Sequence, residues 1–223
     1  MISKELTKRT STSIVLFALL TLMYFYSYIL IISLIIISLI AWIEFYGLIS
    51  KIFIKDNFGD KLLRFICKSF SLLYLSLFTL IILIINSKNS LLEIFIIYSL
   101  LVTISSDIGG FVFGKIFKGK KLTKISPNKT ISGSIGSFSF SVFPLLLFYN
   151  YNQYEYFFST NNLLFCLIIS LVCQLGDLFI SYLKRKAKIK DTGVILPGHG
   201  GLLDRVDGII FAVPFAYLFF ELI

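Results

Sequence analysis

Residues 10–43 read TSTSIVLFALLTLMYFYSYILIISLIIISLIAWI, and the whole run contains no Asp, Glu, Lys or Arg. At the helical rise per residue, one straight α-helix of this length would measure about 51 Å, whereas the hydrocarbon core of a bilayer is roughly 30 Å thick. Two shorter helices, at 11–26 and 29–45 with a turn near Ser27, fit a membrane better. No Gly or Pro marks the turn, so its position rests on length alone.

The composition agrees with a membrane protein. Of the 223 residues, 57% are apolar and 15% are charged, against about 25% charged residues in ordinary globular domains. The mean hydropathy is +0.90. A soluble domain of this size cannot bury so much apolar surface, which excludes soluble, disordered and fibrous classes. We therefore predict an all-α, polytopic integral membrane protein.

Further apolar runs and the distribution of charge give the expected topology. Apolar runs at 70–85, 91–113, 131–149, 163–183 and 208–223 bring the total to about seven transmembrane helices, in a single membrane domain over 1–223. Basic residues collect in cytoplasmic loops, which places the N-terminus and the segments 47–68, 114–130 and 184–207 in the cytoplasm. This arrangement puts only Lys88 outside and accounts for most of the net charge of +9. No nucleic-acid partner is needed to explain the charge.

Two acids lie within the predicted spans. Asp107 and Asp177 stand near the cytoplasmic ends of apolar runs, where an unpaired carboxylate costs a few kcal/mol. Each could be an interfacial residue that reaches water or a loop lysine, or part of a functional site. Gly110 and Gly114, which follow Asp107, could admit a phosphate or form a GxxxG helix-packing pair. Cys166 and Cys173, seven residues apart in an apolar run, are expected to be packing residues.

The loop 114–130 is rich in lysine, which topology alone would explain. Ser126, Lys129 and Thr130 stand beside Gly133 at a predicted helix start. Hydroxyls, a lysine and free backbone N–H groups at such a place suit an anion. We therefore consider this loop a candidate phosphate site.

The segment 176–207 reads GDLFISYLKRKAKIKDTGVILPGHGGLLDRVD and holds the densest charge. On a helix Asp177, Ser181 and Lys184 share one face, and Asp204 and Asp207 share a face in the same way. Carboxylates among many cations suit Mg²⁺ that carries phosphates, because Mg²⁺ favours a few carboxylates plus substrate oxygens. Arginine can bind such phosphates through two hydrogen bonds.

Two further residues of this segment do not indicate one specific role. His199 is the only histidine in the chain and stands between two glycines, where it would shape a tight loop or touch a substrate. Asp191 follows Lys190 and could form a solvated pair with it.

Residues 181–207 resemble the signature of phosphatidate cytidylyltransferases, also called CDP-diacylglycerol synthases. That pattern is S-x-φ-K-R-x4-K-D-x-G-x2-φ-P-x-H-G-G-φ-x-D-R-φ-D, with φ apolar, and every specified position is filled. A second family motif, SPKKT followed by an aromatic residue, Glu and Gly, is matched more loosely, because Asn128, Ile131 and Ser132 depart from it. Residues 41–44 (AWIE) weakly resemble a further family feature. The resemblance covers 91–223 as a catalytic membrane region and 1–90 by hydropathy only.

The resemblance implies that CTP and phosphatidate react to give CDP-diacylglycerol and pyrophosphate, with Mg²⁺ as cofactor. It implies a bacterial cytoplasmic (inner) membrane location with the active site facing the cytoplasm and membrane lipids around it. A second metal ion and a homodimer are compatible with it. The expected catalytic residues are Asp177, Asp204, Asp207, Lys184 and Arg205, with the three aspartates as metal ligands. Substrate phosphates are expected at Ser181, Arg185, Lys190, Lys129, His199 and Asp107.

Three alternatives remain open. A CTP-dependent lipid kinase of the dolichol or phytol type would release CDP instead of pyrophosphate. A transporter or lipid-binding protein would carry polar groups at the bilayer midplane and related halves, neither of which is evident here. An inactive relative is the third alternative, because the first motif is altered.

Overall fold

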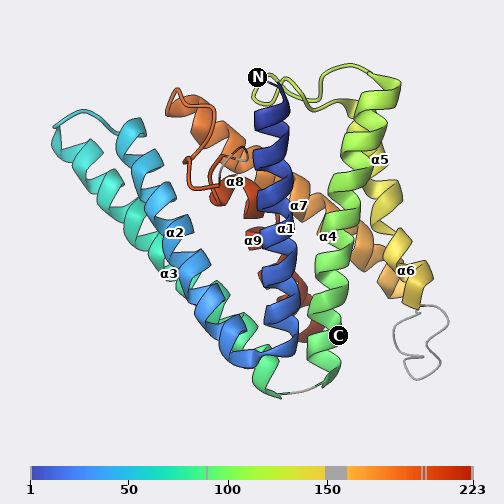
Figure 1. Ribbon diagram of the computed structural model, residues 1–223. Coiled ribbons are helices and arrows are strands. Elements are labelled where there is room, and N and C mark those ends of the chain that lie inside the picture. The colour runs from blue at the N-terminus through green and yellow to red at the C-terminus, as the bar shows by residue number, and fades with distance from the viewer. Residues whose placement is uncertain (1, 89, 149–159, 197, 199, 222–223) are drawn as a thin grey trace. The chain divides into compact units, whose positions relative to one another are not determined.

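The computed structural model describes residues 2–88, 90–148, 160–196, 198 and 200–221, and these are mostly helical (Figure 1). The chain forms two compact units, which we describe separately. The first contains Met1–Ser87 and Leu183–Val206, and the second contains Lys88–Tyr182 and Asp207–Ile223. The single membrane domain expected from the sequence stays a prediction.

The first unit contains α1 (Ile2–Phe25), α2 (Ser27–Ile52), α3 (Phe58–Lys88), the end of α7 (Thr160–Lys186) and α8 (Leu203–Val206). Tyr26 interrupts the long apolar run in an extended conformation, with φ −128° and ψ 104°. The predicted break into two helices near Ser27 is therefore confirmed, although no Gly or Pro produces it.

The core of the first unit joins α2 to the segment after α7. Leu48 and Ile49 of α2 are buried with Ala187, and Leu183 and Ile189 pack around them. A buried apolar contact of this kind fixes the start of the signature segment against α2. The loop that follows therefore begins from a defined position.

The second unit contains α4 (Ser90–Phe117), α5 (Ile131–Ser141), α6 (Phe143–Phe148), most of α7 and α9 (Ile209–Glu221). Its core draws on α4, α7 and α9. Cys166 and Cys173 are buried in it, which confirms their expected packing role. Ser106 of α4 and Ser170 of α7 share a hydrogen bond of 2.7 Å between their hydroxyls. Small hydroxyl residues of this kind commonly join helices that pack in lipid.

Glycines bring α4 and α5 close together. A Cβ atom on Gly133 would lie 2.9 Å from the carbonyl oxygen of Gly110, and one on Gly136 would lie 2.7 Å from that of Gly109. Backbones this close leave no room for a side chain. The helix-packing alternative for Gly110 is therefore confirmed, and α4 and α5 hold the loop between them at a fixed base.

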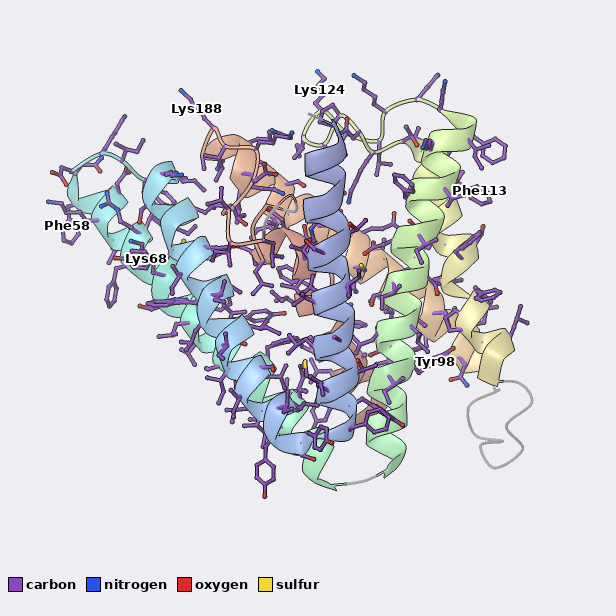
Figure 2. The ribbon with its side chains drawn as sticks, in the orientation of Figure 1. Phe58, Lys68, Tyr98, Phe113, Lys124 and Lys188 are labelled. Atoms are coloured by element: carbon purple, nitrogen blue, oxygen red, sulfur yellow. The ribbon has the colours of Figure 1, made fainter. Side chains whose placement is uncertain are left out.

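Among the residues that the structure describes, four helices are long and apolar enough to cross a membrane. They are Ser27–Ile52, Phe58–Ile84, Ile97–Phe117 and Asn162–Lys186, and the shorter apolar helices Thr10–Phe25 and Ile131–Leu146 accompany them. Apolar side chains project from the outer faces of these helices, while Lys124 and Lys188 extend from loops (Figure 2). The all-α membrane class is confirmed. The number of spans stays a prediction.

Candidate functional site

A buried ion pair closes the signature segment in the first unit. Lys184 Nζ donates to Asp204 Oδ1 at 2.8 Å, and the two side chains are 13% and 8% exposed. Asp204 Oδ2 accepts hydrogen bonds from the backbone N–H groups of Thr192 at 2.8 Å and Gly201 at 3.1 Å. Burial alone would raise the pKa of Asp204, but these hydrogen bonds and the charge of Lys184 outweigh it and lower the pKa.

Glu44 of α2 also binds the signature segment. Its buried carboxylate accepts hydrogen bonds from Thr192 Oγ1 at 2.8 Å, from Leu202 N at 3.0 Å and from Leu203 N at 2.8 Å. The last two donors stand at the start of α8, where helix N–H groups need acceptors. Gly201 packs on this carboxylate, because a Cβ there would lie 2.5 Å from Glu44 Oε2.

A tight turn lies between Thr192 and Gly201, the two residues whose backbone N–H groups donate to Asp204. Leu196 and Gly200 exchange backbone hydrogen bonds of 3.0 and 3.2 Å. Gly198 and Gly200 have φ angles of 77° and 85°, which other residues rarely adopt. The predicted substrate residue His199 lies outside the described residues.

The remaining cations of the signature point outward. Arg185, Lys190 and Arg205 are exposed, as is Asp191. Their exposed side chains can be reached by a phosphate, which Arg and Lys bind through charge-assisted hydrogen bonds. Their predicted role stays a prediction.

In the second unit, Asp177 is surrounded by polar partners. Lys129 Nζ forms an ion pair with Asp177 Oδ2, and Ser181 Oγ donates to Asp177 Oδ1 at 3.3 Å. The shared helix face predicted for Asp177 and Ser181 is confirmed by this contact. The side chains of Lys129 and Asp177 are 27% and 31% exposed, so the pair is accessible to a ligand.

The loop before α5 is folded so that it presents Lys129. Leu122 N donates to the Lys129 carbonyl at 2.8 Å, and Lys129 N donates to the Ser126 carbonyl at 3.1 Å. Thr130 then caps α5, because its hydroxyl accepts from Gly133 N at 3.1 Å. The predicted helix start is confirmed, and the predicted anion site there stays a prediction.

Three carboxylates of the second unit lie around Cys173. Cys173 Sγ donates weakly to Asp107 Oδ1 at 3.8 Å. Asp177 and Asp207 are also within electrostatic reach of Cys173, and Asp107 is within reach of Asp177. These acids come from α4, from α7 and from a position two residues before α9, so helix packing gathers charges that are far apart in sequence.

A metal ion would fit this arrangement only in part. No group of three His, Cys, Asp or Glu side chains lies close enough to hold a metal ion by itself in the described part of the chain. Mg²⁺ does not need such a cage, since it commonly binds one or two carboxylates and takes its other ligands from phosphates and water. The acids of the second unit would supply one or two such ligands and no complete set.

The three predicted metal ligands have different surroundings. Asp204 already has protein donors on both oxygens. Asp177 has Lys129 and Ser181, while Asp207 Oδ1 accepts from Gly208 N at 2.9 Å. Sequence reasoning gave Glu44 no role, although a lone acid in an apolar run was the same signal that singled out Asp107 and Asp177.

Comparison with known proteins gives consistent results. A model of the cytidylyltransferase family matches residues 1–223. The phosphatidate cytidylyltransferase of Rickettsia felis is 48% identical over 116 residues, which cover 49% of this chain and 51% of that protein. Those of Synechocystis sp. (41% over 119 residues, 53% and 40%) and Helicobacter pylori strain 26695 (44% over 117 residues, 52% and 43%) are also similar. The chain spans about half the length of the curated relatives it matches.

Proposed function

Because the chain belongs to the cytidylyltransferase family, we propose that it is a phosphatidate cytidylyltransferase, which makes CDP-diacylglycerol and pyrophosphate from CTP and phosphatidate. The similar bacterial proteins carry that name. The single structural observation that carries the proposal is the accessible ion pair of Lys129 and Asp177, which sets a phosphate-binding cation beside a candidate metal-binding acid.

In the proposed reaction a phosphate oxygen of phosphatidate attacks the α-phosphorus of CTP. A new P–O bond forms there, and the bond from the α-phosphorus to the bridging oxygen breaks, so that pyrophosphate leaves. The lipid phosphate is already a dianion or nearly so, and little proton transfer is needed. The main obstacle is repulsion between two polyanions, which cations must offset.

The residues divide into phosphate-binding and positioning roles. We assign phosphate binding to Lys129, Arg185, Lys190 and Arg205. Lys184, given its pairing with Asp204, would move toward phosphate only by leaving that partner. In the described state we assign Lys184 and Asp204 to holding the signature segment in shape.

Mg²⁺ would neutralise charge on the CTP phosphates when it is bound. We prefer Asp177 to Asp204 as a ligand, because the Asp177 side chain is 31% exposed and that of Asp204 is 8% exposed. Asp207 is a second candidate. Asp107, which is exposed and accepts a weak hydrogen bond from Cys173 Sγ, is a further candidate beside Asp177.

We propose that the protein lies in a bacterial cytoplasmic membrane with its active site toward the cytoplasm. Its apolar helices and the bacterial source of the similar proteins support a membrane protein. The one-sided basic residues support the orientation. CTP would then arrive from the cytoplasm and phosphatidate from the inner leaflet.

Two labels on CTP test the reaction. Purified protein in detergent would receive phosphatidate, Mg²⁺ and CTP labelled with ³²P at either the α or the γ position. We expect the α-label in the lipid fraction and the γ-label in pyrophosphate. The variant Asp177→Asn should lose the lipid label, and Asp60→Asn, an acid of α3 far along the chain from the signature, should retain it.

The same assay separates the alternatives. A lipid kinase would place the γ-label in the lipid and release labelled CDP from α-labelled CTP. A protein that transfers neither label, while correctly folded and supplied with Mg²⁺, would be an inactive relative. Either result would overturn the proposed activity.

A further inference from the structure

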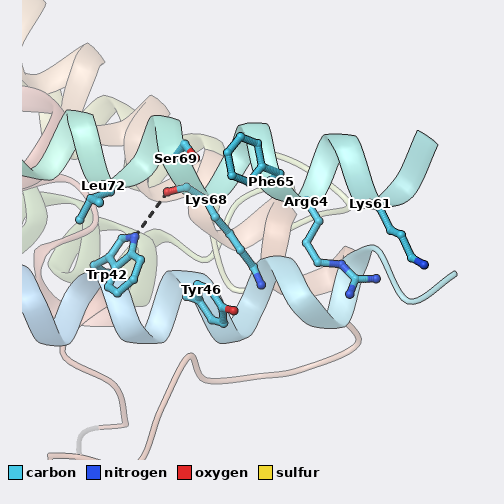
Figure 3. A pocket seen from close by; sticks show the side chains of 8 residues that line it. All are labelled: Trp42, Tyr46, Lys61, Arg64, Phe65, Lys68, Ser69 and Leu72. Atoms are coloured by element: carbon cyan, nitrogen blue, oxygen red, sulfur yellow. Dashed lines mark hydrogen bonds between the residues drawn. The ribbon is translucent and has the colours of Figure 1, made fainter. Parts of the chain in front are cut away.

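A basic and aromatic pocket of about 350 Å³ lies between α2 and α3, at residues to which the proposed reaction gives no role (Figure 3). Lys61, Arg64 and Lys68 line it from α3, and their spacing of three and four residues places them on one helix face. Trp42 and Tyr46 line it from α2. Ligand pockets span about 300–1,000 Å³, so this one suits a small headgroup.

Two contacts between α2 and α3 order part of the pocket. Lys68 Nζ lies 3.3 Å from the centroid of the Tyr46 ring, and Trp42 Nε1 donates to the Lys68 carbonyl at 3.4 Å. Figure 3 shows the Trp42 ring directed from α2 toward α3, and the Lys68 side chain reaching from α3 toward Tyr46 on α2. A ligand would therefore meet a cation that is ordered by its contact with the Tyr46 ring.

The positive charge of the pocket is poorly neutralised by the protein. Arg64 donates from Nη2 to the backbone carbonyl of Phe53, which carries no net charge, and its buried Nε has no hydrogen-bond partner among the described residues. In that same part of the chain neither Arg64 nor Lys68 joins an ion pair, whereas Lys61 pairs with Asp56 at 3.5 Å. That pair is largely exposed and therefore weak.

The pocket stands at the end of an apolar helix surface. The candidate span Phe58–Ile84 includes all three cations, and the apolar run begins at Phe70. Phe70 and Leu73 are 68% and 62% exposed, so acyl chains could lie along α3 next to the pocket. Trp, Tyr, Lys and Arg together are typical of the headgroup level of a membrane, and basic pockets between helices at that level bind anionic headgroups.

We propose that this pocket binds the phosphate of an anionic phospholipid headgroup. Arg64 and Lys68 bind the phosphate oxygens, and the unpartnered Nε of Arg64 gains an acceptor. Trp42 and Tyr46 flank the headgroup, while the acyl chains follow the apolar side of α3. The apolar approach distinguishes a lipid from a soluble phosphate ion as the ligand.

Trp42 provides a direct test, because it is the only tryptophan in the chain. Its emission would be followed while the full chain in maltoside micelles is titrated with dioctanoyl-phosphatidylglycerol, which is not a substrate of the proposed reaction. We expect a saturable change, and a midpoint at least tenfold higher for zwitterionic dioctanoyl-phosphatidylcholine. Equal midpoints for the two lipids would overturn the proposal.

Matched variants test the site. Lys68→Gln should raise the phosphatidylglycerol midpoint at least fivefold, and Arg64→Gln should do the same if its thermal unfolding matches that of the parent chain. Lys51→Gln removes the same charge from an exposed position of α2 outside the pocket and should leave the midpoint unchanged. An equal loss in Lys51→Gln would show only general surface attraction. Inorganic phosphate that reproduced the emission change at a similar midpoint would assign the pocket to a soluble anion. Either outcome would overturn the lipid site.

Discussion

The Glu44 carboxylate accepts a hydrogen bond of 2.8 Å from the backbone N–H of Leu203, 159 residues further along the chain. With Thr192 Oγ1 and Leu202 N, it satisfies three donors of the signature segment. Glu44 is buried, so each donor that loses this acceptor pays the cost of desolvation, about 1–3 kcal/mol. A residue of α2 therefore supports the conformation of the signature segment.

Replacing Glu44 should destabilise the protein strongly, although Glu44 lies far from the signature segment in the sequence. Glu44→Ala leaves three donors without their acceptor, and we expect a loss of at least about 3 kcal/mol, seen as a large fall in the thermal midpoint in detergent. Glu44→Gln keeps one acceptor oxygen, so its thermal midpoint should lie between those of the parent chain and Glu44→Ala. Fully additive effects of Thr192→Ala and Glu44→Gln on stability would contradict an energetic contribution from the hydrogen bond between Thr192 Oγ1 and Glu44.

Glycine 201 offers a steric test of the same contact. Gly201→Ala would bring a Cβ into overlap with Thr192 Oγ1 and within 2.5 Å of Glu44 Oε2, so we expect lower stability and lower CDP-diacylglycerol synthesis. Gly47→Ala is the matched control on α2, where nothing lies within 4 Å of the new Cβ. That control should be neutral or stabilising by up to about 1 kcal/mol. Equal losses in the two variants would contradict the close packing described at Gly201.

The variants Asp204→Asn and Asp177→Asn should differ in their effects on stability and activity. Asp204→Asn breaks a buried ion pair, which costs about 3–5 kcal/mol when one partner is removed, so activity and thermal midpoint should fall together. Asp177→Asn should abolish turnover or raise the Mg²⁺ requirement with a smaller change in midpoint, because Asp177 is 31% exposed. A strong shift in Mg²⁺ requirement for Asp204→Asn alone would reverse this assignment.

Lys129 should affect substrate binding. Lys129→Gln removes the partner of Asp177 and a proposed phosphate contact, and we expect the KM for CTP to rise at least tenfold with a smaller effect on kcat. Lys124→Gln removes an exposed lysine of the same loop and should leave KM unchanged. Equal effects of the two variants on KM would indicate general attraction by the loop rather than a contact at Lys129.

Local patterns could be read from the sequence, and long-range pairing could not. Helix positions follow from hydropathy, and the contact of Asp177 with Ser181 follows from their spacing of four residues on one helix. Lys184 and Asp204 stand 20 residues apart across a loop, and no period relates them. Glu44 is further still from its donors. Such contacts depend on how helices pack, which one sequence does not specify residue by residue.

The hydrogen bonds of Glu44 also bear on how the chain is made. Its donors are synthesised 148 to 159 residues after it, which at ordinary rates of translation takes roughly 8–30 s. During that interval the carboxylate stands in an apolar helix without these three partners, at a cost of a few kcal/mol. Synthesis of residues 192–203 supplies the missing donors, so a segment made late stabilises the conformation of a helix made early.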